Sequence, residues 1–479
     1  MARRSMVHRG GDEHGELLRR AVASIEAELD VPGAFPADVV ADAAASAANP
    51  VLPELDRTDL PLLTIDPLGA RDLDQAMHLE RDGTGYLVWY AIADVAAFVR
   101  PGGATDLEAH RRGETLYAPE HRVPLHPPVL SEGAASLLPD QVRPALLWRV
   151  ALDSAGQRTS TDVRRALVRS RAQYDYVAVQ EALDSGSADE TFALLREIGM
   201  LRQEQERSRG GVSLPTTDQE IDVDGHVWTL VHRAEAPVEG WNAQISLLTG
   251  MAAADLMVSA EVGLLRTLPE ADPRDLARLR RTAAALGLEW PDATPAADFV
   301  RGLDPSVSQH AAMIQACTRL FRGAAYVAFD GTLPEQPRHA AIAAEYAHVT
   351  APLRRLADRY AGEVCLAVCA GEPVPTWALD ALPALPDTMR AADSRASAFD
   401  RAVVDAVEAG LLSSRVGMDL DAVVVSLRDD DPTRGVVVID EPAVEAPLDA
   451  ERPLPLGERI RLRVVAADVE ARTVAFDVL

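Results

Sequence analysis

The stretch "TIDPLGARDLDQAM", residues 64–77, decides how this chain is interpreted. Asp66 ends an apolar run, a Pro-Leu-Gly turn follows, and Asp72 and Asp74 lie two residues apart after it. In an extended segment, side chains two residues apart point to the same side. Carboxylates gathered at a strand end are ligands that Mg²⁺ prefers, and such an ion activates water for phosphodiester hydrolysis. The alternative is a solvated acidic loop, with Arg71 neutralising part of its charge.

The composition is that of a globular protein with an acidic surface. The 479 residues predict two to four domains, and apolar residues make up 48% of them. The net charge of -27 argues against broad, non-specific binding to nucleic acid but leaves room for a local basic channel. All 47 basic residues are Arg, so every contact with phosphate must come from a planar guanidinium.

Nothing in the sequence predicts a membrane or secreted protein. No apolar run approaches the roughly 20 residues that span a bilayer, and the N-terminus lacks the apolar stretch of a secretory signal. Three cysteines are too few for a disulfide framework. Cys365 and Cys369 are interpreted as small buried hydrophobic residues. We therefore expect a cytoplasmic protein.

The pattern of apolar residues changes along the chain. Residues 1–50 have helical spacing, and short apolar runs typical of strands follow to about residue 155. Helices are predicted over 170–210, then a hairpin around Asp224 and Gly225. The chain is predicted to be largely helical over 242–370. The last sixty or so residues hold about five Val-rich strands, the size of a small OB-type barrel.

Three stretches, in the same order along the chain, resemble the RNB family, the ribonuclease II and ribonuclease R exoribonucleases. The first is the acidic stretch at residues 64–77. The second runs from "YAIADV" to "SLLPD", residues 90–140, and the third is "YAHVTAPLRRLAD", residues 346–358. Three ordered matches are far more specific than one.

The resemblance implies an α+β fold in three parts. These are a helical N-terminal segment at residues 1–50, an RNB catalytic domain at 51–410 and an S1-like OB barrel at 415–479. The catalytic block starts close to the first residue, so we expect a short form that lacks the family's N-terminal cold-shock domains.

The resemblance also implies roles for individual residues. Asp66, Asp72 and Asp74 match the acidic positions that hold Mg²⁺ and the attacking water at the 3′ end of RNA, with Asp74 central to catalysis. Arg354 matches the arginine at the scissile phosphate, where it can stabilise charge in the transition state. Tyr117 matches the aromatic position against which a terminal base stacks.

Further residues are weaker candidates for RNA binding. Arg355 is a second candidate for phosphate, although two arginines at a helix start are usually solvated. Arg111 and Arg112 are possible phosphate contacts, with ordinary surface arginines as the alternative. His339 matches a histidine of the family, and alone it would be interpreted as structural.

Gln75 is the main departure from the family pattern, which usually has a fourth Asp there. An amide oxygen can still ligate a metal, so Gln75 is kept in the predicted ligand set. It brings no charge, which predicts weaker Mg²⁺ affinity and favours a one-metal site. Ala351 and Leu356 also replace the usual residues of the third stretch.

The function predicted first is a Mg²⁺-dependent, hydrolytic 3′-to-5′ exoribonuclease. It would act as a monomer, degrading single-stranded RNA to nucleoside 5′-monophosphates. The alternative is a catalytically impaired RNA-binding or scaffold protein on the same fold, which Gln75 and the pI of about 4.8 motivate. A third interpretation is an exonuclease with a narrowed substrate, such as short oligonucleotides or one RNA class.

Overall fold

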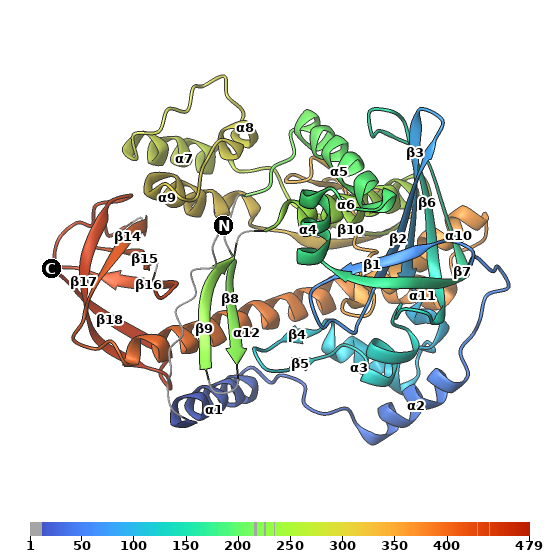
Figure 1. The fold of residues 1–479 in the computed structure, drawn as a ribbon, viewed down its shortest axis with the longest axis horizontal. Helices are drawn as coiled ribbons and strands as arrows, with labels where there is room; N and C mark the ends of the chain where they lie inside the picture. The colour runs from blue at the N-terminus through green and yellow to red at the C-terminus, as the bar shows by residue number, and fades with distance from the viewer. Residues whose placement is uncertain (1–11, 215–217, 225–226, 234, 429, 440) are drawn as a thin grey trace.

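The fold is described from a computed structural model, drawn in Figure 1. It describes residues 12–214, 218–224, 227–233, 235–428, 430–439 and 441–479. In Figure 1 a barrel of long strands stands on the right and a smaller sheet on the left, and a long helix runs between them.

Residues 62–175 contain a closed barrel of five strands in the order β1-β2-β3-β6-β7. The strands are β1 (Leu62–Asp66), β2 (Gln75–Asp82), β3 (Gly85–Ala93), β6 (Val142–Leu152) and β7 (Arg158–Asp175). Neighbouring strands are antiparallel except at the closure, where β1 pairs with β7 in parallel. This closure places Asp66 beside Asp175.

Both faces of the barrel wall are covered. Alternate residues such as Val88 and Tyr90 pack toward one hydrophobic cluster, whereas Ala91 and Ala93 pack toward another. The apolar run "GYLVWYAIA" is therefore almost wholly buried, as expected for a strand with both faces covered.

Helices predicted over 170–210 begin later than expected. Strand β7 continues to Asp175 because its last residues pair with β1, a contact that local sequence does not encode. Asp175 then caps α4 (Tyr176–Ser185), its carboxylate accepting a hydrogen bond from Ala178 N at 2.8 Å. Helix α5 (Glu190–Arg209) follows, capped in the same way by Asp189.

The region predicted to be largely helical also contains a sheet. Strands β10 (Val262–Thr267) and β11 (Ala325–Asp330) form an antiparallel pair, which the expectation missed. A small hairpin, β12 (Arg338–His339) and β13 (Ala344–Glu345), follows. The helices of the region are α6 (Pro237–Ser259), α7 (Pro273–Ala285), α8 (Ala296–Arg301), α9 (Ser308–Cys317), α10 (Leu356–Ala370) and α11 (Thr376–Ala381).

The connection between β3 and β6 carries a short helix and a small hairpin. Helix α3 (Ala104–Arg112) leads into a small hairpin of β4 (Leu116–Tyr117) and β5 (Arg122–Val123). Three short helical turns connect longer elements. η1 (Val95–Ala97) precedes α3, η2 (Leu130–Ala134) precedes β6, and η3 (Thr318–Phe321) follows α9.

The C-terminal part confirms the prediction of an OB-type barrel. After η4 (Leu382–Ala384), helix α12 (Leu385–Ser413) leads into five strands in the order β16-β15-β14-β17-β18, whose edges β16 and β18 lie beside each other. The strands are β14 (Asp419–Leu427), β15 (Arg434–Ile439), β16 (Val444–Asp449), β17 (Arg459–Asp468) and β18 (Thr473–Val478).

The N-terminal segment contains two helices, α1 (Asp12–Glu28) and α2 (Ala37–Ala48). Helix α1 packs on α12 and on the hairpin of β8 (Asp218–Asp224) and β9 (Val227–Arg233). The predicted turn residue Gly225 lies outside the described residues. None of the described helices is long and apolar enough to cross a membrane. Cys365 is buried as expected, and Cys369 is partly buried.

Candidate functional site

The three predicted acids lie where the barrel closes. Asp66 is the last residue of β1, and Asp72 and Asp74 lie in the irregular segment before β2. Gly69 takes a φ of 82°, a left-handed conformation that lets this segment turn back. Asp66 Oδ2 is buried without a hydrogen-bond partner, and burial raises the pKa of Asp66 to about 6.

Asp74 joins the first matched stretch to the third. Its side chain is buried, and its Oδ1 accepts a hydrogen bond from Leu353 N at 2.7 Å. Arg354 Nε lies 3.6 Å from Asp74 Oδ2. Burial raises the pKa of Asp74 to about 8, although Arg354 and the Leu353 amide both favour the charged form. The site is therefore assembled from segments 279 residues apart.

Asp72 has a partner that sequence reasoning missed. Arg122 forms an ion pair with Asp72 through Nη1, and its Nε lies 3.3 Å from Glu132 Oε1. The signal was present in "LYAPEHRV", because a tight hairpin there places Arg122 directly across from Tyr117. Arg122 is therefore a further cation at the edge of the acidic cluster.

Tyr117 reaches the same place from the β4–β5 hairpin. Its side chain is half-exposed and lies within electrostatic reach of Asp72, Asp74 and Arg354. The hairpin is tied to the third stretch by backbone hydrogen bonds, including Thr115 N to Arg354 O at 2.9 Å. An exposed aromatic ring beside acids and a guanidinium fits stacking of a terminal base.

Both ends of the Gln75 amide are already engaged. Nε2 donates to Thr350 O at 2.7 Å, and Oε1 accepts from Tyr90 Oη at 2.5 Å. Tyr90 Oη also lies 2.9 Å from Ser246 Oγ on α6. Gln75 therefore bridges the barrel, α6 and the third stretch. That Gln75 ligates a metal stays a prediction. Its Oε1 would then have to bind the metal as well as accept the hydrogen bond from Tyr90.

The donor chemistry of the cluster fits a hard divalent cation. Asp66 has a buried, unpartnered oxygen, and Asp72 acts electrostatically on both Asp66 and Asp74. As the side chains stand, no three His, Cys, Asp or Glu in the described part of the chain converge on one metal position. One of the three acids, Asp72, is paired with Arg122.

The weaker candidates for RNA binding differ in how far their side chains are already engaged. Arg355 donates to Asp358 through two hydrogen bonds, of 2.6 and 2.9 Å, so its guanidinium is committed to that carboxylate. Arg111 pairs with Glu108 at 3.1 Å and stays largely exposed, which leaves its predicted role open to test.

Arg112 requires a correction. It is only 1% exposed and donates to Glu108 and to the carbonyls of Gly33 and Pro124. Its guanidinium also stacks on Phe35, with 3.7 Å to the ring centroid. These contacts use its donors inside the protein, so the expected contact with phosphate does not fit this structure.

His339 belongs to a row of aromatic rings. Its ring is edge-on to Tyr346, with the centroids 6.1 Å apart, and Tyr346 is edge-on to His348. Burial lowers the pKa of His339 to about 4, and its Nδ1 is buried without a partner. A neutral histidine does not attract phosphate by charge, so any RNA contact here would be a stacking or hydrogen-bonding one.

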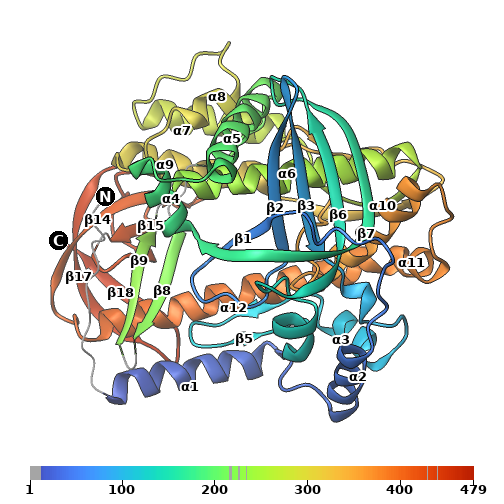
Figure 2. The ribbon, with the colours of Figure 1, turned by 45° about the vertical axis from the view of Figure 1, so that its right-hand side comes forward.

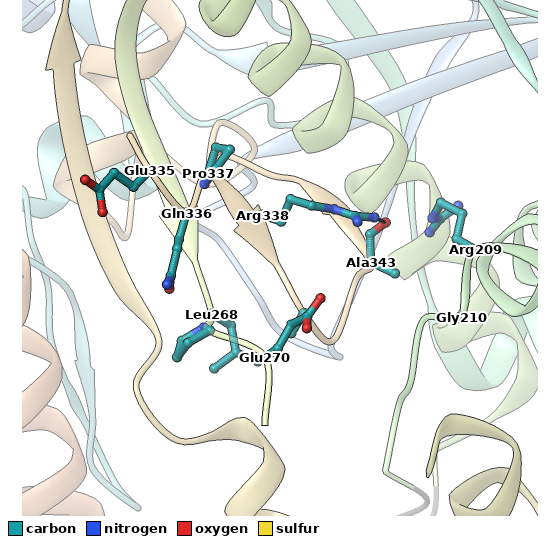
Figure 3. Close-up of a pocket in the computed structure, with 11 residues that line it drawn as sticks. Arg209, Gly210, Leu268, Glu270, Glu335, Gln336, Pro337, Arg338 and Ala343 are labelled. Carbon is teal, nitrogen blue, oxygen red and sulfur yellow. Dashed lines mark hydrogen bonds between the residues drawn. The ribbon is translucent and has the colours of Figure 1, made fainter. Parts of the chain in front are cut away.

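A cavity of about 560 Å³ borders the hairpin that carries His339. Figure 3 shows Arg209 and Arg338 beside Ala343 on one side, with Glu270 and Glu335 elsewhere on the wall. Arg338 donates to Ala343 O at 2.6 Å. Two guanidinium groups and two carboxylates balance each other, so this cavity is not a cationic channel by itself.

Two comparisons with protein families cover most of the chain. The family described as "RNB domain" matches residues 55–368. The chain belongs to the RNB family. The family described as "RNase II-type exonuclease C-terminal S1 domain" matches residues 419–479 of this RNB chain. The exact limits of the three predicted parts, at residues 50, 410 and 415, stay predictions.

Curated relatives of this RNB chain are longer proteins. "Ribonuclease R" of Escherichia coli (strain K12) is 29% identical over 320 residues, which are 64% of this chain and 39% of the relative. "Exosome complex exonuclease RRP44 homolog A" of Arabidopsis thaliana is 27% identical over 349 residues, 69% of this chain and 36% of the relative. The chain thus spans well under half the length of these relatives.

Solved structures share the fold of this RNB chain. The RNase R of Mycoplasma genitalium, in complex with ribose-methylated single-stranded RNA, matches with a TM-score of 0.86 at 18% identity, over 96% of this chain and 78% of that one. Yeast Ssd1, described as a pseudonuclease, matches with a TM-score of 0.67 at 18% identity, over 85% and 51% of the two chains.

Proposed function

We propose that this RNB chain is a hydrolytic 3′-to-5′ exoribonuclease acting on single-stranded RNA. The observation that carries the proposal is the position of Asp74 against Leu353 N and Arg354, with Tyr117 and the other two acids around it. The first and third matched stretches thus meet at Asp74, and Tyr117 of the second stretch lies close to them. The RNase R names of the relatives support the same activity.

Each side chain would act on the 3′-terminal nucleotide. Asp66, Asp72 and Asp74 would hold Mg²⁺, with Gln75 Oε1 as a neutral fourth donor. The bound ion would supply activation of water and neutralisation of the leaving oxygen.

The remaining groups would position the RNA. The Arg354 side chain is half-exposed, so its guanidinium can donate to the scissile phosphate while it faces Asp74. Tyr117 would stack on the terminal base and tolerate any base identity. The products would be nucleoside 5′-monophosphates.

The test is degradation of 5′-labelled single-stranded RNA with Mg²⁺, for the wild type and for Asp74→Asn. We expect stepwise shortening by the wild type and its loss in the variant, with RNA binding retained. Asp82→Asn, an exposed aspartate at the far end of β2, is the control and should shorten RNA normally. If the wild type at micromolar concentration does not shorten the RNA, the proposal is wrong.

A catalytically impaired RNA-binding protein is the second candidate. Gln75 favours it, because its amide makes hydrogen bonds on both sides and brings no charge where the family usually has an Asp. The pairing of Asp72 with Arg122 points the same way. Binding of RNA by the wild type without cleavage would support this candidate. A monomeric state, a cytoplasmic location and any preference for short oligonucleotides stay predictions.

A further inference from the structure

Helix α1 contacts parts of the molecule that are far apart in sequence. Figure 2 shows it running along α12 and beneath the β8–β9 hairpin. Its apolar residues Leu18, Val22 and Ile25 follow helical spacing, are buried, and share one cluster with residues of α12, β9 and the C-terminal barrel. The helix is therefore packed firmly enough to act as a fixed support.

The turn of the β4–β5 hairpin is held by two polar residues of α1. Arg19 makes two hydrogen bonds to Glu120, Nε to Oε2 at 2.8 Å and Nη2 to Oε1 at 2.9 Å. His121 Nε2 lies 2.7 Å from Glu26 Oε1. Arg19 and Glu26 are seven residues apart, so they lie on one face of the helix, two turns apart.

The same turn carries two groups of the candidate site. Tyr117 and Arg122 are cross-strand partners, and they flank the turn formed by residues 118–121. Arg122 in turn pairs with Asp72. Since the strands are two residues long, the hairpin has little internal support, so contacts at its turn add to the backbone hydrogen bond that ties its base to the third stretch.

We infer that α1 is a brace that holds the β4–β5 hairpin, and with it the Tyr117 ring and Arg122, in place beside the acids. Arg19 and Glu26 are positioning residues in this brace. Glu28, which accepts a hydrogen bond from Arg472 at 2.7 Å, links the same helix to the C-terminal barrel. The role of Tyr117 in RNA binding rests on the proposed function, whereas the brace itself does not.

The experiment uses the full chain and compares Arg19→Ala with Arg20→Ala. Arg20 is the exposed neighbour on the same helix and serves as the matched control. Hydrogen exchange of residues 116–123 reports the hairpin directly. Quenching of 2-aminopurine at the 3′ end of a short single-stranded RNA reports stacking at Tyr117. A charge swap, Arg19→Glu with Glu120→Arg, tests rescue.

We expect Arg19→Ala to speed exchange in residues 116–123 by about two- to five-fold, the range of a single partly exposed ion pair. The 2-aminopurine quench should fall in the same variant, and the charge swap should restore both signals. Arg20→Ala should change neither. Unchanged exchange in Arg19→Ala would overturn the brace.

The outcome for the brace is separable from that for the proposed function. Faster exchange with an unchanged quench would overturn the positioning of Tyr117 by α1. If the wild type neither quenches the probe nor shortens RNA, the proposed function fails. The exchange data then still decide whether α1 holds the hairpin.

Discussion

At the scale of single residues, the site buries acidic side chains with few hydrogen bonds or cations to stabilise their charge. Asp66 and Asp74 both have raised pKa values because burial disfavours their charged forms. Gln75 stands beside them as a neutral group whose nitrogen and oxygen each make a hydrogen bond. Replacing a carboxylate by an amide at this position removes charge from the cluster and adds a donor that Thr350 uses.

Changing Gln75→Glu should destabilise the protein when no divalent metal is present. The carboxylate cannot donate to Thr350 O and adds charge to a crowded acidic site, so we expect a loss of about 1–3 kcal/mol. Urea unfolding in EDTA measures it, and added Mg²⁺ should narrow the difference. Gln205→Glu, an amide on α5 that donates to Ala155 O at the surface, is the control. Equal stability of Gln75→Glu and wild type in EDTA would contradict the bridging role.

Glu114 predicts a pH dependence of stability. Burial is the main cause that raises its pKa from 4.5 to about 7. The folded state therefore binds a proton that the unfolded state releases between pH 4.5 and about 7, and stability falls as pH rises through this window. Glu114→Gln removes the penalty, so it should unfold at higher urea concentration than the wild type at pH 8.

The gain from Glu114→Gln should shrink as the pH is lowered to 5, because the wild-type carboxyl is then largely neutral in the folded state. Urea titrations of both proteins at pH 5, 6, 7 and 8 give the comparison. A constant difference across this range would show that Glu114 keeps its usual pKa.

At the scale of elements, helix α6 and the third matched stretch fit closely against each other. Ala347 N donates to Gly250 O at 3.1 Å, in the middle of α6. A Cβ on Gly250 would lie 2.2 Å from Tyr346 Cε2 and 2.6 Å from Ala347 O. The stretch that carries Arg354 is therefore positioned by the absence of a side chain on a neighbouring helix.

Gly250→Ala should displace this stretch and destabilise the fold by about 1–3 kcal/mol, as overpacking does. Gly240→Ala in the same helix is the control. Its added Cβ meets only the end of the Gln203 side chain, at 3.3 Å, and alanine favours helix. Thermal unfolding of both variants checks the prediction. Equal melting temperatures of the two variants would mean that the third matched stretch can shift to make room for the added methyl group at no cost.

The sequence predicted elements well where local pattern decides them. The strands of the first barrel, the helices of the N-terminal segment and the five C-terminal strands follow from apolar spacing and turn residues. The end of β7 and the β10–β11 pair were missed, because each depends on a partner strand distant in sequence. The burial of Arg112 was not predicted, because a run of charged residues in the sequence gives no sign that one of them is buried.

The candidate site was predicted in its parts but not in its connections. The matched stretches gave Asp66, Asp74 and Arg354 as separate positions. Their meeting, the pairing of Arg122 with Asp72 and the two-sided hydrogen bonding of Gln75 are tertiary contacts. No single stretch of sequence encodes them.

At the scale of the whole molecule, the C-terminal barrel is not an independent appendage. Val423 and Val425 on β14 are buried in a cluster with Ala312, Met313 and Cys317 of α9. The core of the barrel is a different cluster, which contains Val424. The strand thus contributes alternate residues to the barrel core and to an interface with the RNB part.

Val425→Asp should uncouple the two parts without destroying the barrel core. It places a charge at a position that is 3% exposed and faces α9, and an unpaired buried charge is costly. We expect one calorimetric transition for the wild type and two for the variant. Val465→Asp, at an exposed site on β17, should keep one transition. A single transition in Val425→Asp would show that the parts do not unfold separately.

The contact between Asp74 and Leu353 also has a consequence for synthesis on the ribosome. With 279 residues between the two partners, the acids emerge long before the segment that completes their surroundings. At translation rates of about 5–20 residues per second, the delay is roughly 15–60 seconds. During that time the nascent chain carries an acidic cluster without its arginine. The candidate site is therefore completed late, after most of the protein has left the tunnel.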